Sequence, residues 1–264
     1  MMNRILAVLC LCATISLGAG TSTYHIVQTD GTNLVWLGGG ITNAVSTSGL
    51  TSNTTVTITN GTPSAAIQAQ IDAQPKNQNG NNLVFSFSAG TYTLTNSLQF
   101  NFFYGGYLAV IGPATSSTTN MIQSAILNGS SYAGVCLQFY GVKSDLVIQN
   151  LKMAYNNSSS GYGIFAQYCT DIRINYCWMM GAGTSGYGTY LEMCRAYGLK
   201  NVFTYGAHAM YVYNGSTLYS RDSINAVNLP GYGISSRGSV IYKQGSQSSG
   251  STSDEYTQYG GQIY

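Results

Sequence analysis

Short apolar runs recur along the second half of the chain at nearly constant intervals. Each run is rich in β-branched and aromatic residues and lacks helical spacing, so each predicts a short strand. Repeats of this length cannot bury an apolar face alone and indicate an all-β fold, a solenoid of stacked strands. The runs are LVIQNLKM (146–153), IRINYCWM (172–179), LKNVFT (199–204) and the weaker TLYSRDSI (217–224), with GYGIFAQYC (161–169) and GYGTYLEMC (186–194) among them.

Stacking predicts that equivalent residues of successive coils form columns along the solenoid. Neighbouring strands lie about 4.8 Å apart, so side chains at the same position of each coil contact one another. An inward column must be apolar or small. We expect such a column from Ile164, Thr189, Ala209 and Ile234.

Two kinds of residue are expected to have architectural roles. Asn150 and Asn201 follow strands, where stacked amides can hydrogen-bond along the coil and satisfy buried backbone groups. Cys169 and Cys194 occupy matching positions of the two GYG elements. We expect them about one strand spacing apart, within the range a disulfide tolerates, and whether they are bridged stays open.

One segment, TPSAAIQAQIDAQP (62–75), has helical spacing. Ile67 and Ile71 lie on one face of the predicted helix, and Pro75 ends it. Two strands separated by a glycine turn follow in LVFSFSAGTYTLTNSLQF (83–100), and GGYLAVIG (105–112) opens another strand.

This opening resembles that of the pectate-lyase-like right-handed parallel β-helix superfamily. The family begins with a capping helix of the form AIQ-x-x-ID-A, followed by an AGTY turn and an S-x-L strand. The corresponding residues here are Ala66-Ile67-Gln68, Ile71-Asp72-Ala73 and Ala89-Gly90-Thr91-Tyr92, whereas Leu98 follows Ser97 directly, a departure from the family pattern. The resemblance implies a right-handed parallel β-helix with an N-terminal capping helix over residues 63–243. Family roles include polysaccharide lyases, glycoside hydrolases, phage tailspikes and secreted adhesins or structural coils.

The chain divides into four predicted segments. Residues 1–20 indicate a signal peptide, because a basic start precedes an apolar run (5–17) that is short for a membrane span, with small residues after it. Residues 21–62 form a β-rich segment, 63–243 the β-helix and 244–264 a Ser/Gly-rich tail. We therefore expect a secreted or cell-surface protein that is not an integral membrane protein; an uncleaved anchor or an intracellular apolar start are the alternatives.

The amino-acid composition limits the classes of partner and cofactor that the protein is expected to bind. Charged residues make up 7% of the chain, against about 25% in ordinary globular proteins, and the net charge is +2. With so small a net charge the chain has no extended basic surface of the kind that binds nucleic acid, so no nucleic-acid partner is expected. After loss of the signal four cysteines remain, none in a CxxC pair, and there are only 2 histidines, so no metal or other cofactor is expected.

Cleavage of a polysaccharide requires charged side chains that lie close to one another. A hydrolase of this kind needs neighbouring carboxylates, and a lyase needs a basic residue beside acidic residues that hold calcium. Among the carboxylates of the repeated coils, including Asp145, we find no pair at a shared position on adjacent coils. An enzyme is thus the less favoured alternative, and calcium is expected only if it is a lyase. The weak catalytic candidates are Asp171, Glu192, Asp222, Arg173, Arg195 and Arg221.

Strand alternation instead predicts an outward stripe that suits sugar recognition. Apolar faces flanked by hydrogen-bonding groups bind sugars, and the predicted stripe joins Phe165, Tyr190 and Met210 with Gln138, Gln167 and Glu192. We therefore expect an exported protein that binds a polysaccharide or cell-surface glycan, adhesin-like or structural. The alternatives are a polysaccharide lyase or glycoside hydrolase, and a phage tailspike component, which would be a homotrimer.

Overall fold

The computed structural model describes residues 26–29, 34–37, 49–114, 124–129, 134–154, 161–180, 185–204, 206–225 and 230–264. The chain separates into two units, Met1–Val45 and Ser46–Tyr264. In the first unit, β1 (Ile26–Thr29) and β2 (Leu34–Leu37) form an antiparallel pair. The predicted signal peptide (1–20) lies outside the described residues.

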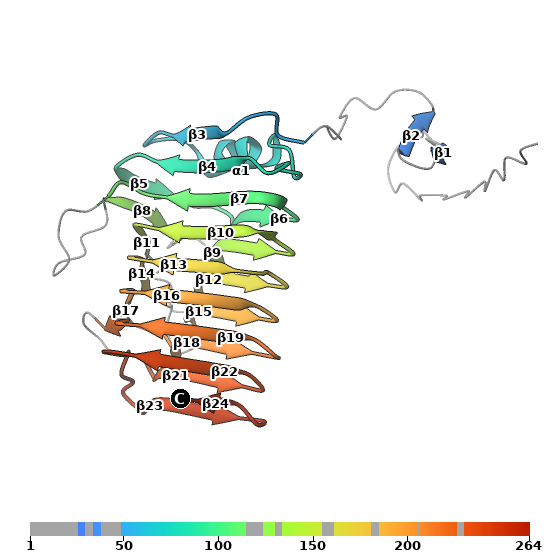
Figure 1. Cartoon of the computed structure of the whole chain (residues 1–264). Coiled ribbons are helices and arrows are strands. Elements are labelled where there is room, and N and C mark those ends of the chain that lie inside the picture. Colours follow the sequence, from blue (N-terminus) through green and yellow to red (C-terminus); the bar gives the residue numbers. More distant parts are fainter. Residues whose placement is uncertain are drawn as a thin grey trace, which may run out of the picture. The chain divides into compact units, whose positions relative to one another are not determined.

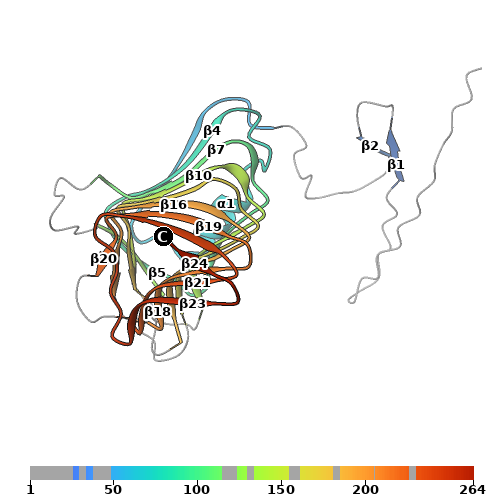
Figure 2. The ribbon, with the colours of Figure 1, turned by 60° about the horizontal axis from the view of Figure 1, so that its bottom comes forward.

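The second unit is a parallel β-solenoid of about seven turns, in which the chain climbs one strand spacing per turn (Figure 1). Its described strands form parallel sheets of nine, six and seven strands, which enclose the core when the coil is seen from its end (Figure 2). All-β architecture and parallel coiling are therefore confirmed.

Within each of the three parallel sheets, the strands stack in the order in which they occur along the chain. The nine-stranded sheet contains β3 (Thr54–Ile58), β4 (Asn82–Phe87), β7 (Tyr104–Ile111), β10 (Lys143–Gln149), β13 (Ile172–Asn175), β16 (Arg195–Leu199), β19 (Thr217–Arg221), β22 (Val240–Gln244) and β24 (Gln262–Ile263). The six-stranded sheet contains β5 (Gly90–Thr93), β8 (Ala125–Asn128), β11 (Leu151–Ala154), β14 (Trp178–Met180), β17 (Val202–Thr204) and β20 (Ile224–Asn225). The seven-stranded sheet contains β6 (Leu98–Asn101), β9 (Val135–Tyr140), β12 (Tyr162–Gln167), β15 (Tyr187–Glu192), β18 (His208–Tyr213), β21 (Tyr232–Arg237) and β23 (Ser253–Gln258).

Left-handed backbone residues make the sharp bends between sheets. The run 146–153 is divided into β10 and β11 by Asn150, which follows a strand as the sequence predicts and whose φ is 57°. Tyr176, Lys200 and Asp222 take the same conformation at the equivalent bends of the next coils, with φ of 53°, 49° and 50°. Asn and Asp tolerate this conformation better than most residues, whereas Tyr and Lys adopt it at a cost that the surrounding ladder of hydrogen bonds offsets.

The expected column of Asn150 with Asn201 is wrong. Strand pairing aligns Asn150 with Tyr176 and Lys200, so Asn201 lies one position further along its coil. There Asn201 is buried and joins two coils: its Nδ2 donates to the carbonyl of Ile174 (2.7 Å) and its Oδ1 accepts from the backbone N–H of Cys177 (3.0 Å).

The interior changes character along the solenoid. Near the N-terminal end, Phe100 packs edge-on to Phe85 at 5.3 Å and stacks on Phe139 at 5.1 Å, all three rings being fully buried. Towards the other end, inward positions are occupied by hydrogen-bonded serines such as Ser220 and Ser236. Burial of the large apolar side chains of the first coils is the main stabilising contribution.

The helix α1 (Ser64–Asp72) lies at the same end of the solenoid as β3 and β4 (Figure 1). It buries Ile67 and Ile71 completely in the core, as the spacing predicts. Gln68 fixes it to β6, since its Oε1 accepts from the backbone N–H of Gln99 (2.8 Å). Among the described residues, no helix has the length and apolar character needed to cross a membrane.

Two expectations about the coil need correction. Met210, not Ala209, pairs with Thr189 and Ile234, so Met210 points inward and Tyr211 outward. The segment 244–264, expected as a tail, contributes β23 and β24, which pair with β21 and β22 and extend the coil.

Candidate functional site

A row of tyrosines runs along the outer face of the nine-stranded sheet. Tyr197, Tyr219, Tyr242 and Tyr264 come from four successive coils, and their neighbouring ring centroids lie 5.1, 4.9 and 5.5 Å apart, with interplanar angles of 10°, 13° and 18°. We call these four residues the tyrosine row. Its rings are substantially exposed, from 40% at Tyr197 to 60% at Tyr264. Arg173 continues the row on the preceding coil, because it pairs in register with Tyr197.

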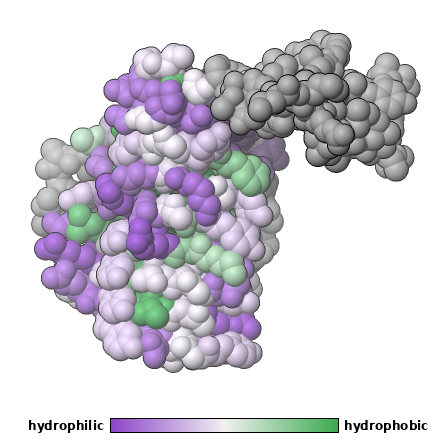
Figure 3. Space-filling model, turned by 45° about the vertical axis from the view of Figure 1, so that its right-hand side comes forward, coloured by the Kyte–Doolittle hydropathy of each residue, from purple (hydrophilic) through white to green (hydrophobic). Residues whose placement is uncertain are grey.

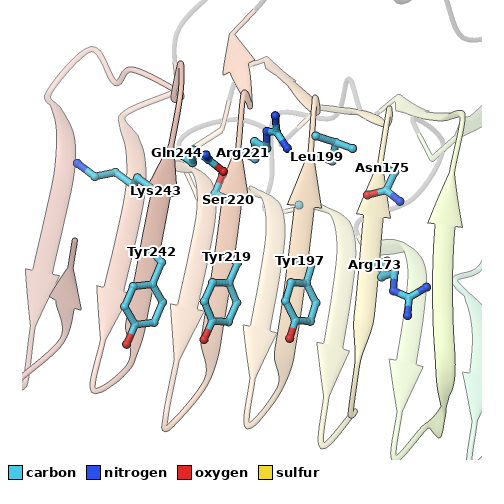
Figure 4. Close-up of a pocket in the computed structure, with 11 residues that line it drawn as sticks. Arg173, Asn175, Tyr197, Leu199, Tyr219, Ser220, Arg221, Tyr242, Lys243 and Gln244 are labelled. Atoms are coloured by element: carbon cyan, nitrogen blue, oxygen red, sulfur yellow. The ribbon is translucent and has the colours of Figure 1, made fainter.

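A second row faces the tyrosines two positions further along each strand. It consists of Asn175, Leu199, Arg221 and Gln244, which are in register with one another; we call it the polar row. The two rows border a groove of about 740 Å³ that runs along the coil axis. Figure 4 shows the rings of Tyr197, Tyr219 and Tyr242 in the same orientation, with all their hydroxyls directed the same way and the polar row opposite.

The face of the coil seen in Figure 3 is mainly polar. On the face of the coil seen in Figure 3, strongly hydrophilic residues gather in the upper half and pale residues of intermediate hydropathy dominate the lower half. Hydrophobic spots there are small and separate. The groove is lined by tyrosine rings and by amide and guanidinium groups, so it suits a ligand that offers both hydroxyls and apolar faces.

A carboxylate pair lies beside the groove, contrary to the sequence expectation. Leu146 pairs with Ile172, which places the preceding residues, Asp145 and Asp171, at a shared position on adjacent coils. Each carboxylate bonds an arginine of the following coil: Arg173 Nη2 lies 3.1 Å from Asp145 Oδ2, and Arg195 Nε lies 2.8 Å from Asp171 Oδ1. The hydrogen bond that Arg195 donates to Asp171, together with the charge of that carboxylate, raises the pKa of Arg195.

The other charged candidates lie apart from this pair. Arg221 Nε is 3.6 Å from Asp222 Oδ2 at the bend that follows the polar row. Glu192 lies on the seven-stranded sheet, where its two carboxylate oxygens accept from Gln167 Nε2 (2.9 Å) and Asn214 Nδ2 (3.4 Å). The sequence-predicted catalytic candidates thus divide between two sheets and do not converge in one cleft.

The predicted aromatic stripe is present on the outer face of the seven-stranded sheet, with one member changed. Phe165 and Tyr190 stack at 5.0 Å, and Tyr211, rather than Met210, continues the stack at 5.4 Å. Gln138 is in register with Phe165, and Gln167 with Glu192. Burial, and secondarily the charge of Glu192, raises the pKa of the Tyr190 hydroxyl.

His208 lies beside this stripe, in an enclosed site at the start of β18. Its ring stacks between Tyr187 (5.1 Å) and Tyr232 (4.9 Å), and its Nδ1 is 2.6 Å from Ser235 Oγ. Burial lowers the pKa of His208 to about 4. Ser235 is fully buried, so a substrate has no access to this pair in the structure.

Within the described ranges, no three His, Cys, Asp or Glu side chains gather closely enough to hold a metal ion. Cys136, Cys169, Cys177 and Cys194 are buried free thiols. Cys169 and Cys194 do lie on adjacent coils, where the backbone N–H of Cys169 is 3.5 Å from Cys194 Sγ.

No family model matches the chain, and neither the curated proteins nor the solved structures give a match. Function must therefore be argued from the surface rows themselves. The tyrosine row was not predicted from the sequence, although the sequence contains a sign of it: in successive coils a tyrosine directly follows a buried apolar residue, as Tyr219 follows Leu218 and Tyr242 follows Ile241.

Proposed function

We propose that the protein binds a carbohydrate chain, from an extracellular polysaccharide or a cell-surface glycan, in the groove between the tyrosine row and the polar row. The observation that carries the proposal is the repetition of exposed, aligned tyrosine rings opposite amide and guanidinium groups. Aromatic rings pack against the C–H faces of sugars, and neighbouring polar groups hydrogen-bond sugar hydroxyls. The groove crosses several coils, so it suits a polymer better than a single small molecule.

We also propose that the protein is exported, that its coil is right-handed and that it belongs to the pectate-lyase-like superfamily. Support for export comes from the basic start and apolar run of residues 1–17. Support for the superfamily comes from α1, which buries the two isoleucines of the AIQ-x-x-ID-A pattern, and from β5, which contains most of the AGTY sequence.

Binding to a polysaccharide panel, followed by calorimetry on the best ligand, tests the proposed function. Tyr219 has ring neighbours on both sides, and its replacement by alanine should weaken binding about tenfold, since an aromatic contact contributes about 1 kcal/mol or more. Tyr104→Ala is the matched control, because Tyr104 is an exposed tyrosine of the same sheet outside the groove. If no glycan binds, or if Tyr219→Ala binds as the unchanged protein does, the proposal is wrong.

A polysaccharide-cleaving enzyme is the second candidate, favoured by one observation. Asp145 and Asp171 occupy a shared position on adjacent coils, next to Arg173 and Arg195 and beside the groove. Carboxylates on adjacent coils with nearby cations are groups that acid–base cleavage of a glycosidic bond uses. New reducing or unsaturated ends in the same panel, with and without calcium, and their loss in Asp171→Asn, would establish this alternative.

A further inference from the structure

The tyrosine row sets a repeat length that a bound polymer must match. Its ring centroids follow one another at 5.1, 4.9 and 5.5 Å, because each ring belongs to the next coil and parallel strands stack about 4.8 Å apart. An extended β-1,4-linked pyranose chain advances by roughly this strand spacing with each sugar. Successive sugars of such a chain align with successive coils, whereas those of a strongly coiled glycan would lose this alignment after one or two sugars.

Charge along the groove is locally compensated. Of the cations that line it, Arg173 is paired with Asp145 and Arg221 with Asp222. Lys243 is in register with the buried Ser220, on the inward side of its strand, and bonds Glu255. No lining cation is left in excess for a chain of carboxylates or sulfates, so charge complementarity favours an uncharged ligand.

We infer that the groove takes an uncharged, extended β-1,4-linked pyranose chain, which lies parallel to the coil axis with one sugar on each coil from Arg173 to Tyr242. This inference rests on the proposed function and adds the ligand class, its direction and its register. On three of the four coils the sugar packs against a tyrosine ring, and on the first coil it lies against Arg173. Its hydroxyls on the other side face Asn175, Arg221 or Gln244. Leu199, the one apolar member of the polar row, gives its coil a less polar contact than its neighbours.

Isothermal calorimetry with defined oligosaccharides tests the inference. The neutral probes are β-1,4-linked oligomers of glucose, mannose and xylose, from dimer to hexamer. The charged probes are the matching oligomers of glucuronic and mannuronic acid. We expect at least one neutral series to bind, with affinity rising by several-fold per added sugar up to the tetramer and levelling off beyond it. Its affinity should change by less than about twofold between low and high salt, because no ion pair forms on binding.

Variants that lack a ring of the tyrosine row test whether one sugar lies on each coil. Tyr242→Ala removes the ring on one of the four coils, so it should weaken the tetramer by about tenfold and the dimer by much less, since a dimer can move to the remaining coils. Tyr104→Ala, outside the groove, should leave every affinity unchanged. Thermal unfolding of both variants confirms that each is folded before binding is compared.

The outcomes separate this inference from the proposed function. Tighter, salt-sensitive binding of the uronic acid series overturns the uncharged ligand while glycan binding stands. Affinity that is flat beyond the dimer overturns the register of one sugar per coil. Absence of binding by every oligomer and polysaccharide overturns both. So does a solution dimer that Tyr219→Ala dissociates, because the groove is then an interface between copies of the chain.

Discussion

Replacing Asn201 by alanine removes two hydrogen bonds that join neighbouring coils at a buried bend. The carbonyl of Ile174 loses its donor and the backbone N–H of Cys177 loses its acceptor, at a position where Asn201 is only 2% exposed. A buried polar group left without a partner costs about 1–3 kcal/mol. Because two such groups are created, we expect the free energy of unfolding to fall by about 3 kcal/mol.

Urea unfolding followed by far-ultraviolet circular dichroism measures this loss. Asn175→Ala is the matched control: Asn175 is a half-exposed asparagine of the preceding coil, and its replacement should change stability by less than about 0.5 kcal/mol. Asn201→Asp provides a finer test, since a carboxylate still accepts from Cys177 but cannot donate to Ile174. A loss in Asn201→Ala no larger than that of the control would refute the view that this amide holds the two coils together.

Two further predictions concern titratable groups. Burial lowers the pKa of His208 from 6.5 to about 4, so the unfolded chain takes up a proton at higher pH than the folded chain does. The stabilisation is complete above about pH 6.5 and is lost as the pH falls towards 4; the urea midpoint should drop across this range, and His208→Gln should flatten the drop. An unchanged profile in the variant would assign the drop to other groups. Cys169 and Cys194 lie on adjacent coils, where the backbone N–H of Cys169 is 3.5 Å from Cys194 Sγ, and a side-chain hydrogen bond with Cys194 lowers the pKa of Cys169. Mild oxidation with glutathione disulfide should therefore link this pair, as peptide mapping would show, while Cys136 and Cys177 stay reduced because burial raises the pKa of each thiol to about 12. Mixed pairing, or four free thiols after oxidation, would contradict this.

The solenoid itself was predictable because its interior imposes a repeat. Each coil must place apolar residues at the same inward positions, and this constraint is visible in the runs around Leu146 and Ile172, which pair as the repeat predicts. Helix α1 was predictable for a similar reason, since two isoleucines four residues apart must share a buried face.

Register was predictable only where successive bends have the same length. The column expected from the sequence put Ala209 inside and Met210 outside, but the structure places both Ala209 and Met210 inside and Tyr211 outside. Hydrophobicity does not separate these choices, because methionine and tyrosine both tolerate partial burial. Packing decides: Met210 fills the space between Thr189 and Ile234, and Tyr211 keeps its ring on the outer stack.

A shift of one residue also concealed the charged site. The register expected from the sequence did not align Asp171 with Asp145, although both aspartates directly precede an apolar run. Outer positions carry no constraint from the core, so only strand pairing reveals which of them stack. For the same reason, the tyrosine row could be read from the sequence only after the register of the strands was known.

The two aromatic surfaces differ in what their rings contact, and this difference is measurable. Tyr190 packs against Phe165, Tyr211 and other rings of its sheet, while the neighbouring Glu192 and Gln167 bond each other. Each ring contact contributes about 0.5–1.5 kcal/mol, so Tyr190→Ala should cost about 2–3 kcal/mol of stability. Among the described residues, Tyr219 has ring contacts only with its two neighbours in the row, and it is 41% exposed, so Tyr219→Ala should cost about 1 kcal/mol while losing most of the glycan affinity. Thermal unfolding and calorimetry on both variants compare the surfaces directly. If Tyr190→Ala loses affinity at unchanged stability, recognition belongs to the seven-stranded sheet, as alternation in the sequence suggested, and the groove on the nine-stranded sheet is not the binding site.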